Sequence, residues 1–262
     1  MDKITKSYRI SYSTSPVRKT TRSTLQAVCR SIRSLDPGAM IPLLAGSLAL
    51  AQRPWDLQRF AQTAFFFNSP QEVLKRLPVP GRPAPALKDN VLWSKDVPLL
   101  EWGSLDDVVM GGVSESSFTS GRFSGLVSAD NNGGFAGCRS KALSPPLQLS
   151  KYTGLQLRVR GDSATRRYKC IVRDSYDWNG IAWSQSFDAL PSTAAGKWQE
   201  VRLPFQNFDP TLFARRIPGA RLNTNAINTV QITYSKFEYD SELNPNWDEG
   251  RFELSIDSIA VY

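Results

Sequence analysis

The sequence predicts a mainly β protein: an antiparallel β-sandwich over residues 91–262, of the jelly-roll kind, preceded by a short helical extension. Apolar and polar residues alternate strictly in segments 155–160, 230–234 and 252–256. Such alternation is typical of strands with one buried and one solvated face, as in antiparallel sheets. Helical periodicity is almost missing after residue 90. Two packed sheets are the arrangement that buries one face of so many strands.

Composition supports a packed core and excludes several kinds of chemistry. Hydrophobic residues make up 41% of the 262 residues and charged residues 21%, which is typical of a globular protein. The chain has no histidine, so Ser-His-Asp catalysis, Cys-His catalysis and histidine metal sites are excluded. Three scattered cysteines, Cys29, Cys138 and Cys170, make neither a four-cysteine zinc site nor a disulfide framework. They indicate a reducing compartment.

Residues 1–36 are interpreted as a basic, Ser/Thr-rich leader that is disordered or cleaved. This segment holds eight basic and two acidic residues, whereas residues 91–262 hold 18 basic and 19 acidic residues. The net charge of +8 therefore belongs to the front of the chain and does not indicate a nucleic-acid partner. Composition of this kind resembles organelle transit peptides. The alternative is a disordered basic arm that stays on the mature protein.

Residues 37–77 are predicted to form a helical extension. The apolar run 39–51 is interrupted by Pro42 and Gly46 and is shorter than the roughly 20 residues that span a bilayer. This predicts peripheral membrane association at most, with helix faces that dock on a partner or lie at the interface.

Two helices are expected after this run. Pro54 suits the first turn of one over residues 54–67. The second, over residues 69–77, has Ser69 as its expected N-cap with a proline at its first position. Residues 78–90 then read as a proline-rich linker, with four prolines within residues 78–85, and the domain boundary is placed there.

Beyond the linker, two further segments alternate less cleanly, 168–173 and 198–205. Turn-forming clusters such as 161–163, 195–197 and 244–246 separate the candidate strands. The spacing of strands and turns is what an antiparallel sandwich requires.

Two glycine-containing motifs, residues 104–114 and 131–140, carry the candidate site. Neither fits a phosphate-binding loop, because no Gly-Lys-Ser/Thr follows the first and neither opens a helix after a strand. Paired glycines permit a positive φ or a close backbone approach, and Asp106 and Asp107 can accept hydrogen bonds from backbone donors in the turn. The motifs serve either as tight connections between strands or as a contact site. Met110 is the residue that separates these two interpretations, since its thioether suits a partner surface as well as a core.

An aromatic segment, residues 174–183, is the second candidate. Trp178 and Trp183 flank a turn-like Asn-Gly, with two aspartates beside them. Rings with adjacent carboxylates suit sugar stacking or a protein contact. The alternative is that both tryptophans cover the edge of the sandwich.

Taken together, the glycine motifs resemble those of the complex I intermediate-associated protein 30 family. The resemblance rests on residues 107–114, on residues 132–135 with the arginine that follows them, and on the closing segment 252–259. The helix at 55–60 is similar to the extension of cyanobacterial and plastid members. The candidate signature and contact positions are Asp106, Asp107, Met110, Gly111, Gly112, Ser114, Asn132, Gly133, Gly134, Phe135 and Arg139.

The resemblance implies a galactose-binding-like β-sandwich that acts as a non-catalytic assembly factor, or chaperone, for a complex I-type NADH dehydrogenase or a related thylakoid complex. The implied partners are protein subunits of a membrane-complex intermediate, and no catalytic residue, cofactor, metal or nucleic acid is carried over. The implied location is the plastid stroma or thylakoid surface, with the mitochondrial matrix side of the inner membrane or the cyanobacterial cytoplasm as alternatives. The other function that the residues allow is a carbohydrate- or small-ligand-binding module.

Overall fold

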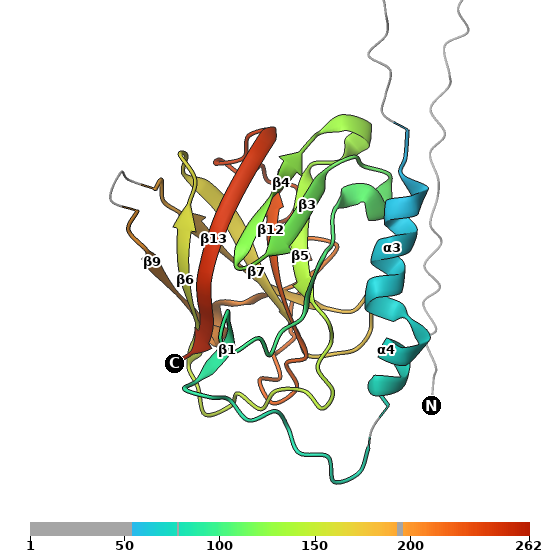
Figure 1. The fold of residues 1–262 in the computed structure, drawn as a ribbon, viewed down its shortest axis with the longest axis vertical. Coiled ribbons are helices and arrows are strands. Elements are labelled where there is room, and N and C mark those ends of the chain that lie inside the picture. Colours follow the sequence, from blue (N-terminus) through green and yellow to red (C-terminus); the bar gives the residue numbers. More distant parts are fainter. Residues whose placement is uncertain (1–53, 78, 193–195) are drawn as a thin grey trace, which may run out of the picture. The chain divides into compact units, whose positions relative to one another are not determined.

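The computed structural model describes residues 54–77, 79–192 and 196–262. They belong to one compact unit, in which two antiparallel sheets face each other as a β-sandwich (Figure 1). The predicted fold class is therefore confirmed. The leader over residues 1–36 and the apolar run 39–51 lie outside the described residues.

The first sheet has the strand order β3-β4-β13-β6-β9, and β1 pairs with the far end of β13. Its long central strand β13 pairs with β4 on one side and with β6 on the other. Its strands are β1 Val91–Ser94, β3 Glu115–Thr119, β4 Arg122–Val127, β6 Gly154–Gly161, β9 Gln199–Pro204 and β13 Gly250–Val261.

The second sheet has the order β11-β10-β8-β7-β12-β5-β2. Its strands are β2 Trp102–Ser104, β5 Phe135–Ser140, β7 Arg166–Arg173, β8 Ala182–Ala189, β10 Asp209–Leu212, β11 Arg215–Arg216 and β12 Thr229–Ser235. The described part of the sandwich also contains three short 3₁₀ turns: η3 Asp107–Met110, η4 Asp130–Asn132 and η5 Phe205–Asn207.

The core lies between the sheets and follows the predicted alternation in β6, where Leu155, Leu157 and Val159 are fully buried. Strand β12 differs from the prediction, because its outward side chains are buried as well. The physical reason is a cover on the outer face of this sheet. The segment after β12 folds back over β7, where Lys169 Nζ donates to the carbonyls of Phe237 and Glu238.

Two helices precede the sandwich, α3 Leu57–Asn68 and α4 Pro70–Lys75. Helix α3 begins three residues later than predicted, because the Asp56 carboxylate accepts the backbone N–H of Arg59 at 2.9 Å and acts as the N-cap. The predicted Ser69 cap of α4 is confirmed, with proline at the first helical position.

The helices pack against the second sheet at its β2–β5 edge (Figure 1). The ring of Phe66 lies directly over Gly103 of β2, where a methyl group would come within 2.3 Å of it. Helix α3 also contacts η3, and Trp55 Nε1, just before the helix, donates to the carbonyl of Val108 at 2.7 Å. Among the described residues no helix is long and apolar enough to cross a membrane.

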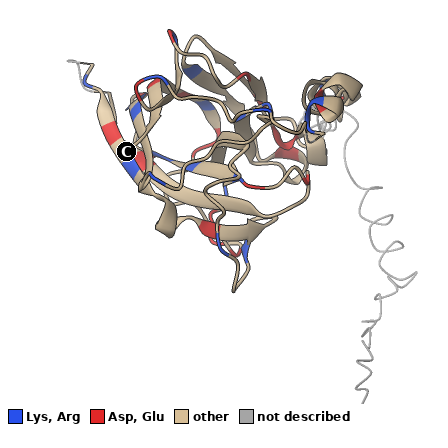
Figure 2. Cartoon of the chain, turned by 90° about the horizontal axis from the view of Figure 1, so that it is seen from below, with Lys and Arg blue, Asp and Glu red and all other residues tan. Residues whose placement is uncertain are grey.

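Basic and acidic residues are interspersed along the backbone of the described unit (Figure 2). This agrees with the near balance of 18 basic and 19 acidic residues in 91–262. The two cysteines that the structure describes, Cys138 and Cys170, are buried as free thiols on either side of Ile232.

Candidate functional site

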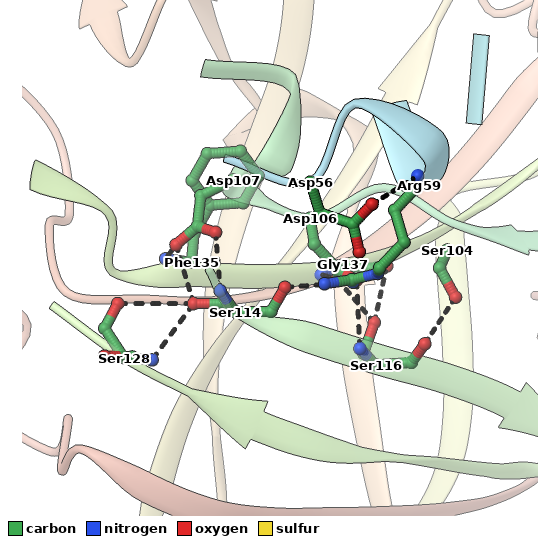
Figure 3. A network of polar contacts seen from close by, with 10 residues as sticks. All are labelled: Asp56, Arg59, Ser104, Asp106, Asp107, Ser114, Ser116, Ser128, Phe135 and Gly137. Atoms are coloured by element: carbon green, nitrogen blue, oxygen red, sulfur yellow. Dashed lines mark hydrogen bonds and ion pairs between the residues drawn. The ribbon is translucent and has the colours of Figure 1, made fainter. Parts of the chain in front are cut away.

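The two glycine motifs meet at one buried carboxylate, that of Asp107. Its Oδ1 accepts the backbone N–H of Ser114 at 2.9 Å. Its Oδ2 accepts the Ser114 hydroxyl at 2.6 Å and the backbone N–H of Phe135 at 3.3 Å (Figure 3). The same oxygen accepts the backbone N–H of Gly134 at 2.7 Å. Asp107 from the first motif therefore ties down the turn that opens the second.

We call the set of hydrogen bonds to the Asp107 carboxylate the first clamp, and the bonds to the Asp106 carboxylate form a second clamp beside it. Its carboxylate accepts the hydroxyl and the backbone N–H of Ser116 at 2.5 and 2.9 Å, and the backbone N–H of Gly137 at 3.1 Å. Arg59 of α3 completes the set, donating to Asp106 Oδ2 and to the carbonyl of Ser114, each at 3.0 Å (Figure 3). Asp106 and Arg59 together join strands β3 and β5 to the helical extension.

The glycines of the motifs are explained by this clamp. A methyl group at Gly112 would lie 2.3 Å from the Asp107 carboxyl carbon, and one at Gly133 would lie 2.4 Å from Oδ2. Gly111 and Gly134 instead have φ values of +91° and +130°, and residues with a side chain rarely adopt such values. The tight connection between strands that the sequence suggested is thus built around a carboxylate. Asn132 adopts a φ of 58°, which asparagine tolerates better than most residues.

Both carboxylates are 1% exposed, and each of their oxygens accepts at least one hydrogen bond. Burial raises the pKa of Asp106 to about 6, against the opposing effect of its donors Ser116, Gly137 and Arg59. Both carboxylates are buried and bonded to the protein's own donors, so neither is open to a substrate. The arrangement can hold strands together; it is not set up for acid/base chemistry.

Met110 lies at the end of η3 and is 75% exposed. The alternative in which this residue belongs to the core is therefore wrong. A side chain of this size, flexible and open to solvent, is available for contact with another surface.

The remaining sequence candidates lie apart from the clamp. Trp183 is 3% exposed in the core, with its Nε1 bonded to Asp174 at 2.9 Å, whereas Trp178 stacks on Arg139 of β5. The structure does not bring the two tryptophans together as one surface. Segment 252–259 runs along β13 in the centre of the first sheet.

Sequence reasoning missed Arg59 as a member of the site, and also the contact between Phe66 and Gly103. Both pairs are separated by more than 35 positions in the sequence. The only local signal was the helix itself, which predicts no particular partner.

An open cleft of about 660 Å³ lies next to Arg59, over strands β3, β4 and β13 and the 162–166 turn. Its lining consists of serines, charged residues and Gly125, together with Phe252. The Phe252 ring is 3% exposed, so the cleft offers no open ring for a sugar to stack on.

Comparison with protein families gives a match to the complex I intermediate-associated protein 30 (CIA30) family over residues 91–256. The chain belongs to the CIA30 family. The CIA30 match contains both aspartates and every strand except the last part of β13, and it begins after α3 and α4. Arg59 therefore reaches into the CIA30 domain from outside it. A comparison with curated proteins gave no significant match.

Solved structures similar to the CIA30 chain include carbohydrate-binding modules. A family 11 module from Clostridium thermocellum in complex with a β-1,3-1,4-mixed-linked tetrasaccharide is 18% identical, with 61% of this chain and 87% of the module covered and a TM-score of 0.42. The family 11 module of the C. thermocellum cellulase Lic26A-Cel5E is 18% identical, with 62% of this chain and 88% of the module covered and a TM-score of 0.41. TmCBM61 in complex with β-1,4-galactotriose is 8% identical, with 67% of this chain and 96% of TmCBM61 covered and a TM-score of 0.32. At these identities the likeness is one of fold alone.

Proposed function

We propose that the protein is a non-catalytic assembly factor that binds protein subunits of a complex I-type NADH dehydrogenase intermediate. The client is mitochondrial complex I, a photosynthetic NADH dehydrogenase-like complex or a related thylakoid complex. Membership of the CIA30 family supports this proposal. The observation that carries it is an exposed apolar surface on the helices and η3, next to a site whose carboxylates are all engaged in structural bonds.

This surface, here called the apolar helix face, consists of Leu57, Phe65, Val73, Leu74, Leu77 and Met110. Leu57 and Phe65 are eight positions apart and thus lie within about 80° of each other around the axis of α3. Phe65 is 69% exposed and Leu74 is 63% exposed. Exposed large apolar side chains that form a patch mark sites of interaction with proteins or membranes, and we infer that these six form such a patch.

The clamps give this face a fixed position. Because Arg59 bonds to Asp106 and Phe66 packs on Gly103, α3 is held against the sandwich at two points. A preformed face loses less conformational entropy on binding than a mobile helix does. The CIA30 domain thus acts, in this proposal, as the rigid support for a contact surface.

The location belongs to the same proposal. We place the protein at the plastid stroma or thylakoid surface, as a cyanobacterial- or plastid-like member of the family, with the mitochondrial matrix and the cyanobacterial cytoplasm as alternatives. The Ser/Thr-rich leader supports an organelle. Residues 1–36 as leader, 37–77 as extension and 78–90 as linker are the corresponding division of the chain.

The test is affinity capture from detergent-solubilised membranes, followed by mass spectrometry of the bound subunits. We expect subunits of one NADH dehydrogenase-type or thylakoid complex to be enriched. Met110→Ser should reduce the capture at least fivefold while leaving the melting temperature within about 1 °C, because the side chain is exposed.

Two outcomes would contradict the proposal. One is the absence of any enriched membrane-complex subunit from membranes of each candidate compartment. The other is specific binding of a soluble β-glucan or galactan with no subunit capture, which would favour the carbohydrate-binding alternative.

A further inference from the structure

Three arginines gather where the helices meet the outer face of the second sheet. Arg76 follows α4, Arg139 lies on β5 and Arg173 ends β7. Arg139 is 7% exposed, and its guanidinium lies 4.7 Å from the ring centroid of Trp178 and 5.9 Å from that of Phe67. Arg139 is therefore buried between the helical extension and the sandwich, with the half-buried Arg76 and Arg173 beside it.

The cluster holds more positive than negative charge, because the Asp177 carboxylate acts on Arg173 alone. Within the described residues, the guanidinium of Arg139 has no hydrogen bond or ion pair, and the Nε atoms of all three arginines are buried without a partner. Arg76 donates other N–H groups to the side-chain oxygen of Asn68 and to a backbone carbonyl, and Arg173 donates to a backbone carbonyl; none of these acceptors carries a net charge. The nearby Glu72 is engaged by Lys75 and Lys141 at 2.8 and 3.4 Å.

A small pocket opens onto these groups. Its lining includes Arg76, Arg139 and Asn228, and its free volume is about 10 Å³. That is close to the space one water-sized particle requires. Asn228 is 1% exposed, and both its side-chain oxygen and its nitrogen lack a partner. The pocket therefore joins free donors to a space for a single small occupant.

The energetics favour an anion as that occupant. Burial, with Arg173 and Arg76 close by, lowers the pKa of Arg139 to about 9, so its guanidinium is still protonated at neutral pH. A buried charge without a counter-charge is strongly destabilising. A water molecule would satisfy hydrogen bonds there and leave the excess positive charge in place.

We propose that this pocket binds one small anion, either a halide ion or a single oxygen of an oxyanion, held by Arg139, Arg76 and the amide of Asn228. The bound anion would fasten the helical extension to the sandwich, because its ligands come from both. This site is separate from the two clamps and does not depend on which client the protein binds.

The experiment measures the melting temperature of the full chain, first in buffer free of halide and phosphate and then with sodium chloride or, separately, sodium phosphate up to 100 mM. Wild type is compared with Arg139→Gln, with Arg76→Gln and with the control Arg158→Gln. Arg158 is half-exposed and pairs with Asp257 on the first sheet. We expect a rise of about 5 °C in wild type and control. The rise should be lost in Arg139→Gln and reduced in Arg76→Gln, whose half-buried position at the end of α4 makes correct folding the expectation.

Without added anion, Arg139→Gln should be at least as stable as wild type, since it removes an uncompensated charge. Replacing chloride with phosphate distinguishes the two occupants: a rise with phosphate alone assigns an oxyanion oxygen, and a rise with chloride assigns a halide. The proposal is overturned if all four proteins respond equally to both salts. It is also overturned if Arg139→Gln loses the same stability at every anion concentration, which is the behaviour of a purely structural side chain.

Discussion

At the scale of single residues, the two glycine motifs are explained by the carboxylates of Asp106 and Asp107, which accept hydrogen bonds from distant backbone segments and so hold these segments together. Asp107 gathers four donors from two motifs, and Gly112 and Gly133 leave room for it. The sequence allowed the prediction that these aspartates accept backbone donors in the turn. It did not reveal which donors, because Gly134 and Gly137 lie 27 and 31 positions away from the carboxylates they bond.

Asp107→Asn should destabilise the fold by about 2–4 kcal/mol. The amide turns one acceptor oxygen into an NH₂ group that faces N–H and O–H donors, so buried hydrogen bonds are lost and donors are left unpaired. Denaturant unfolding measures the change, with Asp130→Asn, at an exposed position of η4, as the matched control. A loss below 0.5 kcal/mol would contradict the role of Asp107 as a clamp.

Asp106 makes the stability depend on pH in a particular direction. Its folded pKa of about 6 lies above the ordinary 3.8, so the unfolded chain loses this proton first as the pH rises. Stability from this group is therefore present below pH 4 and falls as the pH rises to about 6, by about 3 kcal/mol in total. Asp188 and Asp240 have lowered pKa values and act in the opposite sense at more acidic pH.

The measurement compares wild type with Asp106→Asn at pH 4.5 and pH 7, so that the other groups cancel. The free energy of unfolding of wild type should fall relative to the variant between these values. An unchanged difference would show that burial does not raise this pKa.

At the scale of elements, strands with one face in the core could be predicted from sequence, as in β6 and β13. The order of the strands could not, since the pairing of β13 with both β4 and β6 leaves no local pattern. Of the two helix starts, one could likewise be predicted from the sequence and the other could not. Ser69 and the proline after it identify one cap, whereas Pro54 suggested a start that the better-capping Asp56 takes instead.

Gly103→Ala tests the docking of α3. The added methyl group would overlap the Phe66 ring, which must then leave its place on β2. Hydrogen exchange of the α3 amides should become at least tenfold faster, while the strands of both sheets keep their protection. Ser117→Ala, at an exposed position of β3, is the control. Equal protection of α3 in the variant would mean that this contact does not hold the helix.

At the scale of the whole molecule, the sequence predicted a sandwich with a helical extension, and the structure adds that the extension is part of the site. Only the structure shows that Arg59 and Asp106 come together, because folding of the sandwich places β3 and β5 beside α3. The exposure of Met110 and Phe65 also depends on packing that a sequence pattern does not record.

The protein should associate with membranes only peripherally. The described helices are too short to span, and the apolar run 39–51 is broken by Pro42 and Gly46. An alkaline carbonate wash should release the protein from isolated membranes into the supernatant. Retention in the pellet with integral subunits would contradict this expectation.

The central claim is that the apolar helix face binds the client, and capture by face variants tests it most directly. Phe65→Ser and Leu74→Ser are combined in one protein and compared with Phe213→Ser, an even more exposed aromatic at the β10–β11 turn on the other edge of the second sheet. With folding verified by melting, the double variant should retain less than a tenth of the wild-type capture of membrane-complex subunits, and Phe213→Ser should retain nearly all of it. Full capture by the double variant, or equal losses in both proteins, would contradict the account.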